Sequence, residues 1–164
     1  MKTTTPIRTI AETTKALIQH IADECKTIDR EAAFAESLDE SGEVNVCGLT
    51  FSPSRIWQEL DPTAFRCGVN DHADAMDWTE IDGETYDTRE AETARDQFIS
   101  DLESEAEAMD EEITEEEERA EALHADGETA DAAQLFAMID NDKTDLAVLQ
   151  DTIETLTKIE LYNL

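Results

Sequence analysis

Apolar residues recur along the chain at two kinds of spacing, and each spacing predicts one type of secondary structure. Steps of three and four predict helices, whereas alternation predicts strands. The strongest helical pattern runs from Phe98 to Leu123 and has the spacing of coiled-coil a and d positions. One side of this predicted helix carries Ile99, Leu102, Ala106, Met109, Ile113, Glu116, Ala120 and Leu123. Seven of these eight residues can be buried, so we expect a helix with an apolar seam.

A second periodic segment follows a turn at Asp126-Gly127. Its apolar positions are Leu135, Ile139, Leu146, Leu149, Ile153 and Leu156. Asp87 and Glu90 predict a capping box for the first helix, which we expect over about residues 88–124. Because the connection is short, the two helices are expected to fold back as an antiparallel αα-hairpin. The expected pairs are Ile113 with Ile139, Ala106 with Leu146, Leu102 with Leu149 and Ile99 with Ile153.

The first half of the chain predicts shorter elements. Thr5-Pro6 is typical of a helix start, and residues 30–38 predict a second helix. Residues 43–51 alternate β-branched residues around Gly48 and predict one short β-hairpin or an extended segment. Further helices are expected over residues 53–60 and 63–78, after Ser52-Pro53 and Asp61-Pro62. The residues of the helix at 53–60 that are expected to face inward are Ile56, Trp57 and Leu60.

These patterns together predict a mostly α protein. We expect a compact helical domain with a small β element over residues 1–85. Residues 86–164 are expected to form the acidic, coiled-coil-like antiparallel helical hairpin.

The charge of the chain is strongly one-sided. Its 164 residues include 42 Asp and Glu against 12 Lys and Arg, which gives a net charge of -30 and a pI near 4.1. Direct binding to nucleic acid or to an anionic membrane is disfavoured, because both need clustered basic side chains. Three cysteines without a CxxC pair, and the lack of a signal-like or membrane-length apolar run, predict a cytoplasmic protein with reduced thiols.

The acidic charge is densest in the predicted helix 98–123, which has twelve Asp or Glu and one Arg. Six pairs of acids four residues apart repel one another there, at a cost of about 1 to 3 kcal/mol in all. Glu115 with Arg119 is the one expected i,i+4 offset, and the second helix supplies only Lys143 and Lys158. A group outside the chain is therefore expected to neutralise this surface.

A stretch in the middle of the chain resembles a known group of proteins. The residues are Gly48-Leu49-Thr50-Phe51-Ser52-Pro53-Ser54, then Leu60-Asp61-Pro62-Thr63-Ala64-Phe65-Arg66-Cys67-Gly68, and Asp71. This text resembles small, acidic bacteriophage and prophage proteins of unknown activity. The resemblance implies a phage context and assigns no site.

Three functional interpretations fit the charge. In the first, carboxylates on rigid helices imitate nucleic-acid phosphates and bind a basic host protein that handles DNA or RNA, as an inhibitor. The second is adaptation to concentrated salt, and the third is a viral structural protein that oligomerises through the coiled-coil hairpin. The neutral first thirty residues disfavour a uniform salt adaptation. The residues expected to bind the partner are Glu103, Glu107, Asp110, Glu111, Glu117 and Glu118.

An enzyme is the least favoured class, and we expect no catalytic residue, metal site or cofactor. Cys67 with His72, or with Cys47 added, could serve as nucleophile and base or as zinc ligands. However, Cys67 and His72 are five residues apart, which does not align them on one helix face, and no third group is specified. We expect small buried thiols and an exposed histidine instead. Residues 140–151 begin like a calcium loop, but position six is Asp145 rather than Gly and position twelve is Asp151 rather than Glu. The apolar period continues through this segment, which predicts a charged helix surface.

Overall fold

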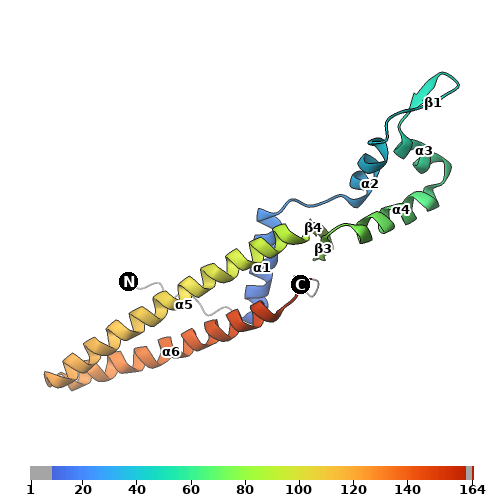
Figure 1. The fold of residues 1–164 in the computed structure, drawn as a ribbon. Coiled ribbons are helices and arrows are strands. Elements are labelled where there is room, and N and C mark those ends of the chain that lie inside the picture. The colour runs from blue at the N-terminus through green and yellow to red at the C-terminus, as the bar shows by residue number, and fades with distance from the viewer. Residues whose placement is uncertain (1–8, 162–163) are drawn as a thin grey trace. The chain divides into compact units, whose positions relative to one another are not determined.

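The computed structural model describes residues 9–161 and Leu164, and this part of the chain is mostly helical, as predicted (Figure 1). The expected helix start at Thr5-Pro6 lies outside the described residues. The described helices are α1 Ile10–Glu24, α2 Arg30–Asp39, α3 Pro53–Leu60, α4 Pro62–Ala75, α5 Thr88–Ala125 and α6 Thr129–Lys158. The described strands are β1 Val44–Val46, β2 Leu49–Phe51, β3 Trp78–Ile81 and β4 Glu84–Asp87.

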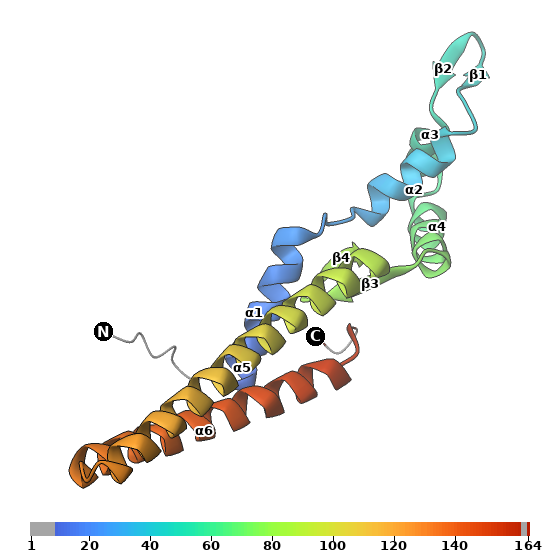
Figure 2. The same cartoon turned by 60° about the vertical axis from the view of Figure 1, so that its left-hand side comes forward.

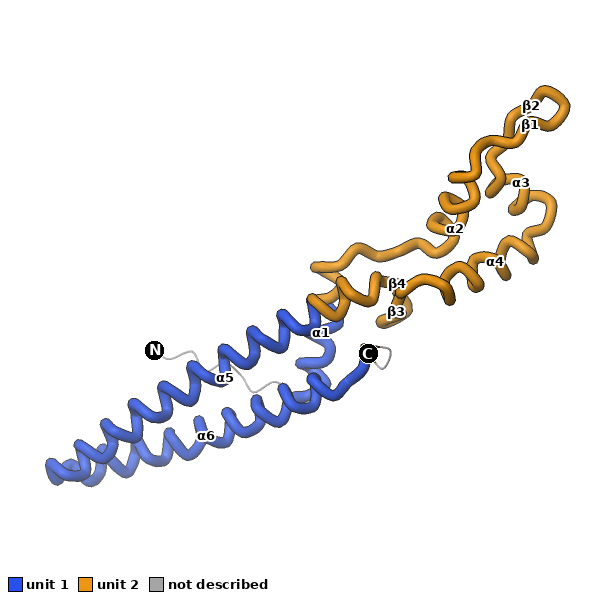
Figure 3. The backbone as a smooth tube through the Cα atoms, in the orientation of Figure 1, with its two compact units in different colours: residues 1–20, 94–160 blue, residues 21–93, 161–164 orange. Residues whose placement is uncertain are grey.

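The chain divides into two compact units (Figure 3). Unit 1 consists of residues 1–20 and 94–160, and unit 2 of residues 21–93 and 161–164. The division falls inside α1 and α5, so each of these helices contributes to both units. The units therefore differ from the two segments that we predicted, 1–85 and 86–164. Independent folding of those two segments stays a prediction.

In unit 1, α5 and α6 lie side by side as an antiparallel hairpin, which both views show (Figures 1 and 2). The turn between them contains Gly127 at φ 88°, a backbone conformation that suits glycine. The buried core of the hairpin consists of Ala106, Ile113, Ala120, Ile139 and Leu146. Met109, Leu135, Leu149 and Ile153 pack against this core. The predicted αα-hairpin is thus confirmed, and both of its apolar seams are used within one chain.

Unit 2 has a small aromatic core between α2 and α4. Phe34, Phe65 and Val69 are buried together, and the rings of Phe34 and Phe65 are 5.3 Å apart. The Asp39 carboxylate, near the end of α2, accepts hydrogen bonds from the Ser54 backbone N–H at 2.9 Å and the Ser54 hydroxyl at 2.8 Å. This contact caps the first turn of α3 and ties it to α2.

The predicted hairpin at residues 43–51 is confirmed. β1 and β2 are antiparallel, with Val44 opposite Phe51, Asn45 opposite Thr50 and Val46 opposite Leu49. Cys47 and Gly48 form the two-residue turn with φ values of 54° and 85°. Positive φ at both positions is the geometry of a type I′ hairpin turn. The Gly48 N–H also donates to the Asn45 Oδ1 at 3.1 Å.

A second hairpin was not predicted. Residues up to Trp78 were expected to be helical, but α4 ends at Ala75, and Trp78–Ile81 pairs with Glu84–Asp87. Asp82-Gly83 forms its turn, with φ values of 50° and 83°. Ile81, Thr85 and Tyr86 are buried, and Arg30 Nε donates to the Thr85 hydroxyl at 2.7 Å. Positive φ at both turn residues is the geometry of a type I′ turn, which favours the hairpin over a longer α4.

We predicted that three side chains of α3, those of Ile56, Trp57 and Leu60, face inward, and this prediction is wrong for two of them. Leu60 is 81% exposed and Trp57 is 43% exposed, whereas Ile56 is half-buried. Trp57 meets Phe34 only edge-on, with ring centroids 6.2 Å apart. The helix has the expected length, but helical periodicity alone does not say how much of an apolar stripe another element covers.

Candidate partner-binding face

All six residues predicted to bind a partner lie on α5, and helical periodicity places them on one side of it. Glu103, Asp110 and Glu117 occupy coiled-coil e positions, and the remaining three occupy b and f positions. We call this set the acidic face: Glu103, Glu107, Asp110, Glu111, Glu117 and Glu118. Its members are exposed, except Glu117, which is half-buried.

The packing of α6 fixes the direction of the acidic face. Ala106, Ile113 and Ala120 of α5 are buried against the hairpin core, with exposures of 8%, 5% and 0%. Burying these a positions leaves the b and f positions of the same helix in solvent. The carboxylates are therefore held outward along a regular helix whose other side is fixed by the core.

One member of the acidic face already has a partner in the chain. Lys143 Nζ on α6 donates to the Glu117 Oε1 at 2.6 Å. This hydrogen bond, together with the charge of Glu117, raises the pKa of the Lys143 ammonium. The second lysine of α6, Lys158, pairs with Glu154 of its own helix and lowers the pKa of that carboxyl. Of the two lysines of α6 that could offset the acidic charge of α5, only Lys143 therefore pairs with the acidic face.

The other five members make no side-chain hydrogen bond or ion pair with any residue that the structure describes. The expected pair between Glu115 and Arg119 is likewise not formed in the described part of the chain, so this prediction is wrong. Arg95 pairs with the adjacent Asp96 at 2.8 Å. Neither arginine therefore offsets the charge of the acidic face.

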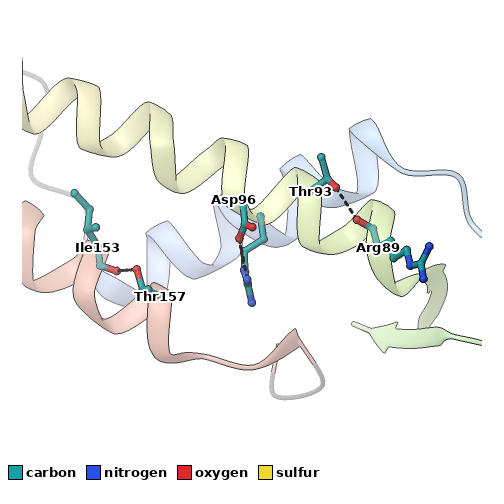
Figure 4. Close-up of polar contacts among 6 residues, drawn as sticks. Arg89, Thr93, Asp96, Ile153 and Thr157 are labelled. Carbon is teal, nitrogen blue, oxygen red and sulfur yellow. Dashed lines mark hydrogen bonds and ion pairs between the residues drawn. The ribbon is translucent and has the colours of Figure 1, made fainter.

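The uncharged polar residues between the acids bond to the backbone of α5. Ser104 donates to the Ser100 carbonyl and Thr114 to the Asp110 carbonyl, each at 3.0 Å. Figure 4 shows the same pattern for Thr93, which donates to the Arg89 carbonyl at 2.7 Å, and for Thr157, which donates to the Ile153 carbonyl at 2.8 Å. Because these hydroxyls are occupied, carboxylates are the principal groups that the acidic face offers to a partner.

The charge density of the hairpin is close to that of a nucleic-acid strand. α5 contains fifteen Asp and Glu against three Arg, and α6 contains six Asp and Glu against two Lys. At about 1.5 Å of rise per residue, the acidic face spans about 22 Å from Glu103 to Glu118. Its five acids other than Glu117, which pairs with Lys143, give one charge per about 4.5 Å. One strand of B-DNA carries one charge per about 3.4 Å.

The thiols and the histidine of the α4 region lie in different environments. Cys67 is exposed, although we expected it to be buried, and Cys47 is exposed at the β1–β2 turn. His72, expected to be exposed, is half-buried, with its ring 5.6 Å from both Phe34 and Trp78. No group of three or more His, Cys, Asp or Glu in the described residues is arranged to hold a metal ion.

Cys25 is the one buried thiol. Its burial, followed by the charges of Glu90, Glu24 and Asp87, raises its pKa and disfavours the reactive thiolate. The calcium-like residues 140–151 lie within α6, which continues through them as a regular helix, as predicted.

Comparison with protein-family models, curated proteins and solved structures found no match to the chain. The resemblance of residues 48–71 to phage proteins therefore stays a prediction. Among the helices of the described residues, none combines the length and the apolar composition that crossing a membrane requires.

Proposed function

We propose that the protein is a binding protein whose acidic face imitates the phosphates of a nucleic acid and occupies the nucleic-acid site of a basic protein. The observation that carries this proposal is the row of outward carboxylates on α5, five of which make no side-chain hydrogen bond or ion pair with another described residue. A basic partner would supply the Lys and Arg side chains that α6 does not.

The hairpin suits this role because the helical backbone that carries its carboxylates is already formed before binding. A regular helix fixed by a buried core loses little freedom when a partner contacts its exposed side, which lowers the cost of association. Since the partner's groove binds phosphates, the interface would consist mainly of charge pairs. The affinity for the partner would therefore fall as the salt concentration rises.

The resemblance of residues 48–71 to phage proteins favours a particular biological setting. In that setting the partner is a host protein that handles DNA or RNA in defence or recombination, and the acidic protein inhibits it. Uniform salt adaptation is less favoured, since the first thirty residues carry five basic and four acidic side chains. Assembly through the α5 seam is also less favoured, because α6 of the same chain covers that seam.

The test uses two variants with the same net charge. The face variant combines Glu103→Gln, Glu107→Gln, Asp110→Asn, Glu111→Gln and Glu118→Gln, and leaves Glu117 in its pair with Lys143. The control neutralises five exposed acids on other sides of the same hairpin: Asp101→Asn, Glu105→Gln, Glu115→Gln, Asp140→Asn and Asp151→Asn. Both variants remove five negative charges, so any difference between them reports the position of the charges.

The tagged wild-type protein and both variants are incubated with lysate of a candidate host, washed at moderate salt and eluted with duplex DNA. We expect the wild type and the control to release one basic nucleic-acid-binding protein, and the face variant to release none. Equal retention by all three proteins, or no protein released by DNA, would contradict the proposal.

The same variants test the repulsion on α5 without a partner. The face variant removes three repelling i,i+4 pairs, Glu103/Glu107, Glu107/Glu111 and Glu111/Glu115. It should therefore gain about 0.6 to 1.5 kcal/mol in unfolding free energy at low salt. Urea unfolding followed by circular dichroism measures this gain. A gain that persists undiminished at high salt would show that charge repulsion is not its cause.

A further inference from the structure

The sequence Asp-Gly-Glu-Thr occurs twice in the chain, at two turns of different geometry. The first copy covers residues 82–85 and includes the turn of the β3–β4 hairpin, and the second covers residues 126–129 and joins α5 to α6. An aspartate followed by glycine is prone to close a cyclic imide, because glycine has no Cβ to hinder its own amide nitrogen. Since the four residues of the two copies are identical, a difference in this reaction between them reports the fold.

At Asp82-Gly83 the fold leaves the reacting groups accessible. Both residues are exposed, and a Cβ built on Gly83 would meet no atom within 4 Å. The Gly83 N–H donates no hydrogen bond, and the Asp82 carboxylate makes no hydrogen bond or ion pair, to any residue that the structure describes. Asp82 also has φ 50°, a left-handed conformation that is unfavourable for a residue with a Cβ. This strain makes it easier for Asp82 to leave the turn conformation.

At Asp126-Gly127 the amide nitrogen is engaged. The Gly127 N–H donates to the His124 carbonyl at 3.2 Å, and the Glu128 N–H donates to the Leu123 carbonyl at 3.0 Å. These two hydrogen bonds form a Schellman motif, which ends α5 and holds the turn in place. Ring closure at Asp126 therefore has to break a hydrogen bond that is absent at Gly83.

We propose that Asp82-Gly83 is a site of spontaneous isomerisation to isoaspartate, and that the product opens the β3–β4 hairpin. The Gly83 nitrogen attacks Cγ of Asp82, the amide proton and a carboxyl hydroxyl leave as water, and a succinimide ring closes. A second water molecule then opens the ring. Attack at Cγ restores aspartate, whereas attack at the backbone carbonyl carbon of Asp82 gives isoaspartate. Water is thus the only co-reactant.

The product is incompatible with the register of the hairpin. In isoaspartate the main chain runs through the side-chain Cβ and Cγ, which adds one atom to the backbone of the two-residue turn. Because turn type and loop length set the register, the pairing of Ile81 with Glu84 across the turn is lost. Ile81 and Tyr86 are 1% and 3% exposed, so the change removes buried side chains from their packing in unit 2.

The experiment compares the two sites within one protein. The full chain is incubated at mildly acidic pH near body temperature, both in buffer and in urea at a concentration that unfolds it, as circular dichroism shows. Trypsin then gives the peptides 67–89 and 120–143, each of which contains one Asp-Gly pair. Isoaspartyl peptides have the same mass as aspartyl peptides but elute separately, so chromatography with mass spectrometry measures the rate at each site.

The expected result is a difference that depends on folding. In buffer, Asp82 should isomerise at least about fivefold faster than Asp126, the effect of one hydrogen bond that has to open at Gly127. In urea the two rates should become similar, because the two copies differ only in their flanking residues. The same ratio in both solvents, a faster reaction at Asp126, or no isoaspartate at Asp82 in buffer would overturn the proposal.

A protease pulse tests whether the product opens the hairpin. The incubated protein is held in moderate urea and exposed briefly to protease, which digests the molecules whose structure has opened. The surviving molecules should contain severalfold less isoaspartate at residue 82 than the sample before the pulse. An equal content before and after the pulse would refute the opening of the hairpin. Neither measurement involves the acidic face of α5, so each proposal can fail without the other.

Discussion

Gly68 on α4 allows a test of the packing in unit 2, because replacing it by alanine has two opposing effects on stability. The added Cβ favours the helix, but it also crowds the core. Replacing a glycine by alanine inside a helix usually stabilises the helix by about 1 kcal/mol. At Gly68, however, an added Cβ would lie 2.5 Å from Cζ and 2.8 Å from Cε1 of the Phe34 ring. Both distances are well below van der Waals contact, so the ring or the helix has to move.

The surroundings of Phe34 restrict that movement. The side chain is 9% exposed, and its ring contacts those of Phe65, Trp57 and His72 at centroid distances of 5.3, 6.2 and 5.6 Å. Overpacking a filled core typically costs about 1 to 3 kcal/mol. After subtracting the gain in helix propensity, Gly68→Ala should destabilise unit 2 by up to about 2 kcal/mol.

A double-mutant cycle separates the two effects. Phe34→Leu removes the end of the ring, so Gly68→Ala in that background should become stabilising by about 1 kcal/mol. The coupling between the two positions should therefore be about 1 to 3 kcal/mol. Urea unfolding followed by tryptophan fluorescence reports on this unit, because both tryptophans of the chain, Trp57 and Trp78, lie in it. The same stabilisation by Gly68→Ala in both backgrounds would refute the close approach.

Two further predictions concern the hairpin core and the thiols. Ile139→Ala should lower the free energy of unfolding by about 2 to 5 kcal/mol, because the side chain is 2% exposed in the hairpin core. Met138→Ala, at a position 46% exposed, should lower it by less than about 1 kcal/mol. Urea unfolding monitored by circular dichroism measures both values, and similar losses would contradict the burial of Ile139 between the two helices. With a thiol reagent near neutral pH, the exposed Cys47 and Cys67 should react rapidly and Cys25 slowly. The reason is that burial and nearby carboxylates raise the pKa of the Cys25 thiol. Three equal reaction rates would show that Cys25 is not protected.

Much of the local structure follows from the sequence alone. The extents of α2, α3 and α5, the presence of α6, the β1–β2 hairpin and the pairing of the two long helices all agree with its apolar periodicity and turn residues. These features depend on residues close together in the chain, or on two long patterns joined by a short turn. The placement of the six acids on one side of α5 is predictable for the same reason, since it needs only the period of a helix.

The remaining features depend on contacts between distant segments, which a single sequence pattern does not specify. The Asp82-Gly83 turn of the β3–β4 hairpin is a local signal that the helical interpretation missed. The hydrogen bonds from Arg30 to Thr85 and Glu80, by contrast, join distant segments and could not be predicted. Only the fold shows that Leu60 stays exposed, because exposure depends on which neighbours an apolar residue meets.

The sequence by itself determined the helical class, the dense negative charge and the side of α5 on which that charge lies. Helical period and composition suffice for these properties. Only the tertiary structure decided that Lys143 reaches Glu117 and that Val44, Val46 and Leu49 of β1–β2 stay exposed. Those outcomes depend on the distances between side chains from separate elements, and a single sequence pattern does not specify these distances.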